Sequence, residues 1–239
     1  MPWACGEVRQ SNKAMRIVGG YEAQRAEIPW ICILELRGDP ICGASVIAPK
    51  WNIGASHCVS QTFDRPNDMR MLCGVHDRTI TEYGSQTGQV VQYYKHPKYS
   101  GSTIDYDLCL FGEYYRPLNK DLYNVCLEMK DAWQFTDYVK PICLPGLHKF
   151  PQPGTLCKVA GWGSIHEVAP GTFLWHVEMA RSLRAVHVPI IEQAQCAAKY
   201  KDQISRRMFC AGYTEGGRDA CQVKNNTCSL SSGVYLWLV

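Results

Sequence analysis

The ten residues WNIGASHCVS (51–60) give the first indication of how this chain folds and of the chemistry it carries. They place a histidine beside a cysteine, and Cys42 lies sixteen positions before Cys58. A disulfide between these cysteines would staple a short loop across His57 and fix its imidazole, as a general base requires. The pattern also suits a surface histidine in a disulfide loop, so the flanking segments must decide between the two interpretations.

Short β-branched or aromatic runs, separated by Gly, Pro, Asn and Asp, flank this stretch on both sides. Strands this short and this regularly spaced predict an all-β fold built as a sandwich or barrel. Two segments favour helix, residues 191–201 and part of residues 118–133. The Pro- and Gly-rich residues 141–154 are the best linker candidate. The runs are WICILEL (30–36), ASVIAP (44–49), MRMLCGVHD (69–77), QVVQYYKHP (89–97), TLCKVAGWG (155–163) and LRAVHVPII (183–191).

Length and composition narrow the class of protein. The 239 residues suffice for one large β domain or two small ones. Apolar residues make up 46% and charged residues 20%, which argues against disorder. The net charge is only +3 and no basic run carries interleaved aromatics, so nucleic acid is not an expected partner. The apolar runs are too short to cross a bilayer.

The thirteen cysteines indicate an oxidising, extracellular compartment and several disulfides. Zinc is the competing explanation, but the closest two cysteines, Cys221 and Cys228, are seven positions apart, which is wide for a zinc ribbon or finger. No metal or other cofactor is therefore expected. The number is odd, so at least one thiol is left over. The N-terminal MPWACGEVRQ lacks a signal-peptide pattern, so a secreted-type chain of this kind reads as a fragment.

Six motifs, taken together and in order, resemble the trypsin/chymotrypsin-like serine proteases. The resemblance runs from about Cys5 to Gln222, although ASHC departs from the usual AAHC. It implies an all-β fold of two antiparallel β-barrels of the chymotrypsin type, with the active site in the cleft between them. The motifs are RIVGG (16–20), ASHC (55–58), HPKYSGSTIDYDLCL (96–110), PICLP (141–145), GWG (161–163) and CAGYTEGGRDACQ (210–222).

The resemblance also implies domain limits. Residues 1–16 would be a leader and residues 17–222 the protease domain, with a first barrel over about 17–140 and a partial second barrel over about 155–222. Residues 223–239 would be a tail foreign to the family. The family's final strands would then be missing, which predicts an incomplete and unstable second barrel with exposed strand edges.

Each family role falls on a residue of this chain. His57 matches the general base, and Asp107 matches the carboxylate that orients its imidazole. Asp219 matches the acid of the primary specificity pocket, which selects Arg or Lys by charge-assisted pairing. Arg16 and Ile17 match the activation cleavage. The disulfides implied are Cys5–Cys143, Cys42–Cys58 and Cys196–Cys210.

Asp107 has a rival within residues 112–133, which carry an insertion relative to the family. There KDLYNVCLEM echoes YDLCLF at nearly the family spacing from PICLP, so Asp121 is a second candidate. Spacing from HPKY favours Asp107.

The pattern breaks after DACQ, where the family continues GDSGGP. Val223 replaces the oxyanion-hole glycine, Lys224 the aspartate that receives the freed Ile amine, and Asn225 the nucleophilic serine. An amide cannot attack a carbonyl as an activated serine does. Ser232, in CSLSSG, is a weak candidate for a displaced nucleophile, since the glycines of the strained turn are not encoded.

Several cysteines lose their family partners in this tail. Cys157 and Cys221 would normally pair with cysteines that this chain does not contain, and Cys228 could take one of them. Four more are extra to the family pattern, and their pairing cannot be read from sequence, although bonds between neighbouring strands are possible. They are Cys32, Cys73, Cys109 and Cys126.

Two functions therefore stand. The first is a trypsin-like endopeptidase family member, acting on polypeptides after Arg or Lys and matured by an activating protease, whose present chain does not cut because the GDSGGP segment is missing. The second is a non-catalytic homologue that binds protein partners or inhibitors.

Overall fold

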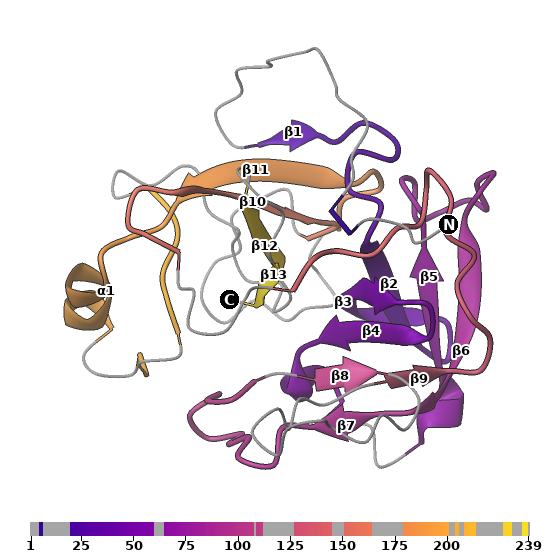
Figure 1. The fold of residues 1–239 in the computed structure, drawn as a ribbon, viewed down its shortest axis with the longest axis horizontal. Helices are drawn as coiled ribbons and strands as arrows, with labels where there is room; N and C mark the ends of the chain where they lie inside the picture. The colour runs from indigo at the N-terminus through magenta and orange to yellow at the C-terminus, as the bar shows by residue number, and fades with distance from the viewer. Residues whose placement is uncertain are drawn as a thin grey trace.

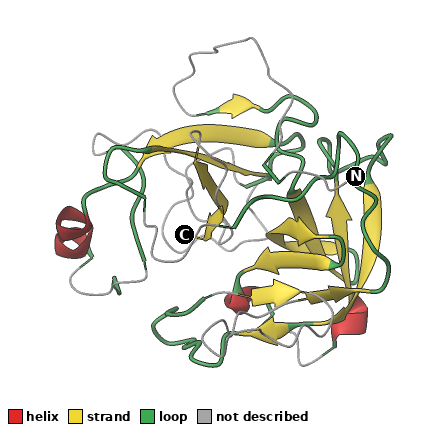
Figure 2. Cartoon of the chain, viewed as in Figure 1, coloured by secondary structure: helices red, strands yellow, loops and turns green. Residues whose placement is uncertain are grey.

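The structure is a computed structural model, and it describes about two thirds of the chain. Within that part all regular structure is strand except one short α-helix and two 3₁₀ turns, so the predicted all-β fold is confirmed (Figure 2). For residues 109–111, 127–128, 227–230 and 236–238 only the backbone is described. The described ranges are 5–6, 20–59, 65–107, 109–111, 127–144, 151–163, 179–200, 204–205, 208–213, 227–230 and 236–238.

An eight-stranded antiparallel sheet forms the first barrel, in the order β3-β2-β5-β6-β9-β4-β8-β7 (Figure 1). Because β3 also pairs with β4, the sheet curls and closes on itself. Its strands are β2 (Ile31–Leu36), β3 (Asp39–Ala48), β4 (Trp51–Gly54), β5 (Met69–Cys73), β6 (Gln86–Gln92), β7 (Tyr94–Lys95), β8 (Cys109–Phe111) and β9 (Leu127–Met129).

The interior of this barrel follows the period of the strands. In β5, Met69, Met71 and Cys73 point inward and are fully buried, while Arg70 between them is exposed. Leu34 and Val90 complete the same core from β2 and β6. Alternation of this kind fixes which face of each strand is covered.

A second, five-stranded antiparallel sheet has the order β1-β11-β10-β12-β13. Val159, Val188 and Ile190 form a small core of their own here. Residues 227–230 and 236–238 supply β12 and β13, and β12 pairs with one edge of β10. The strands are β1 (Tyr21–Glu22), β10 (Leu156–Gly161), β11 (Arg184–Pro189), β12 (Thr227–Leu230) and β13 (Leu236–Leu238).

The N-terminal strand β1 joins this second sheet, although the expected limits group it with the first barrel. It pairs with β11, Tyr21 opposite Ala185. Gly20 makes the approach possible, because its φ is +93° and a Cβ there would lie 2.9 Å from the Ala185 carbonyl oxygen. The close backbone contact therefore draws the segment to the second sheet.

The two helix predictions have different outcomes. Helix α1 (Gln193–Lys199) lies within residues 191–201, as predicted. The tendency within residues 118–133 is wrong for its described part, because residues 127–129 form β9. That strand pairs with β6 and β4, and tertiary pairing overrides a weak local preference. The rest of that segment, with Asp121, lies outside the described residues.

Disulfides tie these elements together. The structure contains the three pairings that the resemblance implies, Cys5–Cys143, Cys42–Cys58 and Cys196–Cys210. A fourth, Cys32–Cys73, joins directly paired positions of β2 and β5 with a Cα–Cα distance of 4.2 Å. Cys157 is disulfide-bonded as well, to a cysteine whose side chain lies outside the described residues.

Candidate active site

His57 lies in a short turn that follows β4. The turn is a 3₁₀ helix, Ser56–Cys58, whose end is closed by the Val59 N–H donating to the Ser56 carbonyl. The Cys42–Cys58 disulfide anchors it to β3. Ser56 and Cys58 are buried, so the backbone on both sides of His57 is held while 22% of its own side chain is exposed.

Asp107 reaches this turn because β8 pairs with β4. Gly54 lies opposite Cys109 in that antiparallel pair. His57 follows Gly54 by three residues and Asp107 precedes Cys109 by two, so both project from the same end of the strand pair. Two residues that are fifty positions apart in sequence thus become neighbours.

Two hydrogen bonds join the pair. The His57 backbone N–H donates to Asp107 Oδ1 at 2.8 Å, and His57 Nδ1 lies 2.5 Å from Asp107 Oδ2. A carboxylate on Nδ1–H fixes the tautomer in which Nε2 carries the lone pair. This arrangement can take a proton from a nucleophile or a water molecule placed at Nε2.

His57 also stands beside the disulfide, with Nε2 3.7 Å from Cys58 Sγ. The potential ligand atoms of Cys42, His57 and Cys58 lie within 4.8 Å of one another. The two sulfurs are joined to each other, however, so neither offers the thiolate that a metal ion requires. The cluster therefore acts as the staple that the sequence predicts for this histidine.

The other predicted site residues lie outside the described residues. They are Arg16, Ile17, Asp121, Asp219, Val223, Lys224, Asn225 and Ser232. Of the predicted site residues, the structure therefore brings together His57 and Asp107.

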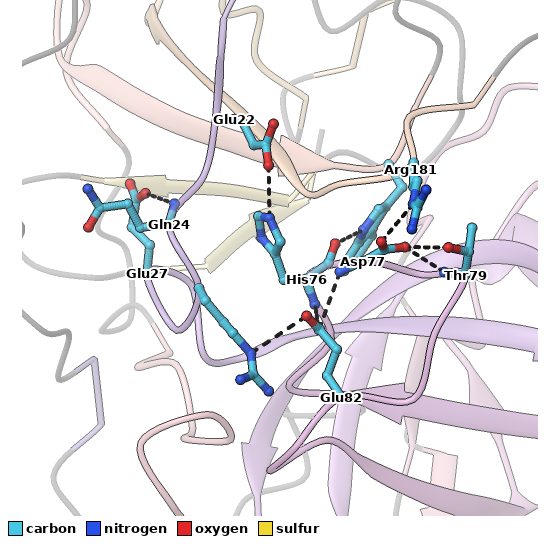
Figure 3. Close-up of polar contacts among 10 residues, drawn as sticks. Glu22, Gln24, Glu27, His76, Asp77, Thr79, Glu82 and Arg181 are labelled. Carbon is cyan, nitrogen blue, oxygen red and sulfur yellow. Dashed lines mark hydrogen bonds and ion pairs between the residues drawn. The ribbon is translucent and has the colours of Figure 1, made fainter.

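Residues 74–85, here called the joint loop, make polar contacts with residues of the second sheet and its flanks and with the N-terminal segment (Figure 3). The His76 carbonyl accepts hydrogen bonds from the Trp162 indole and from the Leu183 N–H, both at 2.9 Å. Asp77 accepts from Arg181 Nε at 2.7 Å. The loop of the first barrel is thereby fixed against residues of the second sheet and its flanks.

The same loop holds the N-terminal segment. His76 Nε2 lies 3.1 Å from Glu22 Oε1, and Glu82 forms an ion pair with Arg25 (Figure 3). The Arg25 guanidinium also lies 4.5 Å from the centre of the Tyr138 ring. Hydrogen bonds from His76 and Ser182 lower the pKa of Glu22. Sequence motifs gave no signal for this joint, because its partners lie far apart in the chain.

Hydrogen bonds also shift the pKa values of Asp77 in the joint loop and of Glu27 in the N-terminal segment. Hydrogen bonds from Thr79, with help from Arg181, lower the pKa of Asp77 to about 2. Burial by itself would raise the pKa of Glu27, but hydrogen bonds from Lys158, Tyr21 and the Gln24 N–H outweigh it, and the net shift is downward. Burial and the nearby Lys158 ammonium lower the pKa of His187.

The curled barrel and the His57–Asp107 pair beside the Cys42–Cys58 disulfide match the trypsin/chymotrypsin class of protein. Comparison with known proteins agrees, since the trypsin family model matches residues 17–223. The chain belongs to the trypsin family.

Two relatives illustrate the similarity. Transmembrane protease serine 9 of Rattus norvegicus is 30% identical over 242 residues, covering 98% of this chain and 20% of that protein. Mannan-binding lectin serine protease 1 of Mus musculus is 31% identical over 237 residues, covering 91% of this chain and 29% of that protein. The chain thus spans less than a third of the length of either relative. Among the described residues no helix is long and apolar enough to cross a bilayer.

Proposed function

We propose that this chain is a trypsin-type protease homologue that recognises polypeptides at Arg or Lys, with His57 and Asp107 as its base and orienting acid. The observation that carries the proposal is the double contact of Asp107 with the His57 backbone N–H and Nδ1, at 2.8 and 2.5 Å. Membership of the trypsin family and the names of the two relatives, both proteases, support the same class of substrate.

Specificity for Arg or Lys rests on Asp219, which stands in GGRDACQ. A buried carboxylate at the base of a pocket pairs with a guanidinium or ammonium group and rejects neutral side chains. Benzamidine mimics the arginine head group, so we expect the protein to bind it. Asp219→Asn should lower that affinity at least about tenfold, the loss of one charge-assisted hydrogen bond. Equal affinity in both proteins would remove Asp219 from the pocket.

Hydrolysis is a separate question, and we infer that this chain does not cut. Asn225 stands at the position of the nucleophile, and its amide cannot be activated by His57 as a serine hydroxyl is. Lys224 replaces the carboxylate that would pair with the Ile17 amine after cleavage, and two ammonium groups repel each other. The retained base and acid would then lack a partner for acyl transfer.

An active-site phosphonate that reacts with activated serine tests this inference. The unsubstituted chain should not be labelled, whereas Val223→Gly/Lys224→Asp/Asn225→Ser should gain labelling that depends on His57. Labelling of the unsubstituted chain that disappears in Ser232→Ala would overturn the inactive assignment and make Ser232 the nucleophile. A His57→Gln control in each background separates active-site reaction from surface reaction.

The disulfides support a proposal for how the protein matures and where it acts. Cys5–Cys143 ties the leader to the linker region, and the Gly6 N–H donates to the Pro141 carbonyl at 2.9 Å beside it. Cleavage between Arg16 and Ile17 by an activating protease would therefore leave the leader attached. Disulfides of this number suit an extracellular protein, and we propose that this one is secreted.

A non-catalytic binding role is the second candidate, and Asn225 is the observation that favours it. Such a homologue would hold protein partners or inhibitors in the family cleft without turnover. Tight binding and slow release of an intact Arg-containing peptide would support it, whereas benzamidine binding without phosphonate labelling is expected for either candidate. Release of cleaved peptide would exclude it.

A further inference from the structure

Asn52 carries a buried amide across the interior of the first barrel. It lies on β4 and its side chain is inaccessible to solvent. Its Oδ1 accepts a hydrogen bond from Trp133 Nε1 at 2.8 Å. Its Nδ2 lies 3.4 Å from Cys32 Sγ and 3.9 Å from Cys73 Sγ. Because an indole nitrogen only donates, the orientation of the amide is settled, with oxygen toward Trp133 and nitrogen toward the disulfide.

These contacts join four separate parts of the barrel. Cys32 belongs to β2, Cys73 to β5, and Trp133 to the segment after β9. The backbone N–H of Trp133 also donates to the Pro49 carbonyl. Neither β2 nor β5 is a neighbour of β4 in the sheet. A polar amide in an apolar interior costs free energy unless it is hydrogen-bonded, so these partners favour the alignment in which the amide is paired.

The amide also supplies information that the apolar pattern of β4 lacks. Asn52, Ile53 and Gly54 are all buried, so the strand shows no alternation between a covered and an exposed face. The burial pattern of β4 therefore does not distinguish one register from the next, and a slip by one residue would exchange the faces of its side chains. With a slip, Asn52 would leave the disulfide and Trp133, and Ile53 would meet the indole N–H in its place.

The register of β4 determines where the two site residues meet. Asn52 lies opposite Phe111 and Gly54 opposite Cys109 in the β4–β8 pair. His57 and Asp107 extend from the same end of that pair, and a shift of one residue along an extended strand is about 3.3 Å, more than the length of their hydrogen bonds. A displacement of that size would break both contacts.

We propose that Asn52 is a positioning residue for the His57–Asp107 pair, acting through the register of β4 against β8. Its importance for catalysis rests on the function proposed above, but the positioning itself is measurable without turnover. The Trp133 indole and the Cys32–Cys73 disulfide are the fixed points against which the amide holds the strand.

The test compares Asn52→Val/Trp133→Phe with its matched control, Trp133→Phe. The double variant removes both hydrogen-bonding partners and leaves an apolar interior, so no indole N–H is left buried and unpaired. We expect it to fold. In the control, Asn52 still reaches the disulfide.

The readouts are the exchange rate of the His57 backbone N–H and the far-downfield proton signal of a His Nδ1–H held by a carboxylate. We expect the double variant to lose the downfield signal and to exchange the His57 N–H at least about tenfold faster than the control, as a locally opened segment does. Exchange in β2 should be equal in both.

Equal His57 exchange and an equal downfield signal in the two variants would overturn the proposal and leave Asn52 only as a partner for Trp133. If the double variant does not fold, Asn52→Ser serves with the same readouts, because it shortens the side chain without adding bulk. Absence of the signal in the unsubstituted protein would instead refute the His57–Asp107 pair itself. That result would contradict the proposed function, whereas equal readouts in the two variants would contradict only the role of Asn52.

Discussion

Replacing Lys158 by Met breaks the ion pair that fastens the N-terminal segment to the second sheet. Lys158 Nζ donates to Glu27 Oε1 at 2.8 Å, and the two side chains are only 22% and 10% exposed. Glu27 lies 131 positions earlier in the chain, just after β1, whereas Lys158 belongs to β10. The pair therefore adds a side-chain link between the N-terminal segment and β10, beside the backbone pairing of β1 with β11.

The expected loss can be worked from these contacts. Removing one partner of a fully buried ion pair costs about 3–5 kcal/mol, because the other charge is left uncompensated. Glu27 keeps the hydrogen bonds from Tyr21 and from the Gln24 N–H, and Lys158 is partly exposed. We therefore expect Lys158→Met to lower the free energy of unfolding by about 2 kcal/mol at pH 7, near the value of one hydrogen bond to a charged group.

The destabilisation caused by Lys158→Met should depend on pH, because it requires a charged Glu27. The pKa of Glu27 is lowered in the folded protein, so its contribution is present above the ordinary carboxyl pKa of 4.5 and is lost as the pH falls through the folded value. The cost of Lys158→Met should therefore shrink in acid, where Glu27 becomes neutral. The pKa of His187 should rise in the variant, because the Lys158 ammonium no longer opposes its protonation.

Urea unfolding at several pH values measures this cost, and the double-mutant cycle with Glu27→Gln measures the coupling. Lys199→Met, at the exposed end of α1, removes the same charge and should change stability by less than about 0.5 kcal/mol. A cost for Lys158→Met that is equal at pH 7 and in acid, together with zero coupling, would refute the reasoning.

Three further predictions follow from other contacts. Cys32→Ala/Cys73→Val removes a crosslink between residues 41 positions apart, and the gain in loop entropy of the unfolded chain should lower the free energy of unfolding by about 4 kcal/mol. Thermal unfolding should show a lower midpoint, and an unchanged midpoint would mean that the bond is not formed. Gly20→Ala should destabilise by about 1–3 kcal/mol in urea, since its φ is +93° and a Cβ would approach the Ala185 carbonyl; Gly154→Ala, also at positive φ but with open space, should cost less. Cleavage after Arg16 should leave one band on a non-reducing gel and release a small leader only with reductant; release without reductant would contradict the Cys5–Cys143 bond.

The described part of the site, His57 and Asp107, could be predicted from sequence, because each residue stands in a motif with a recognisable spacing. The HC dipeptide after a short strand predicted a stapled histidine, and the structure shows Cys42–Cys58 beside it. Spacing from HPKY favoured Asp107, which lies against His57. The strand runs also gave the all-β class, since period and turn residues report on nearby neighbours only.

The rest could not be read because it depends on segments that are distant in the chain. No sequence pattern predicts a disulfide between Cys32 and Cys73, because several other cysteines were equally possible partners. The structure decides the pairing, since β2 and β5 are neighbouring strands. Helical preference within residues 118–133 lost to strand pairing in β9.

The sequence by itself determined the family and the order of its motifs, and it predicts Asn225 at the position of the nucleophilic serine, because these are matters of residue type and spacing. Only the tertiary structure showed that Asn52 crosses the barrel, that the joint loop binds both sheets, and that the tail contributes β12 and β13. Each of these depends on a contact between residues separated by tens of positions, whose meeting is set by sheet order and register. Local sequence patterns predict neither the order of strands in a sheet nor the register between them.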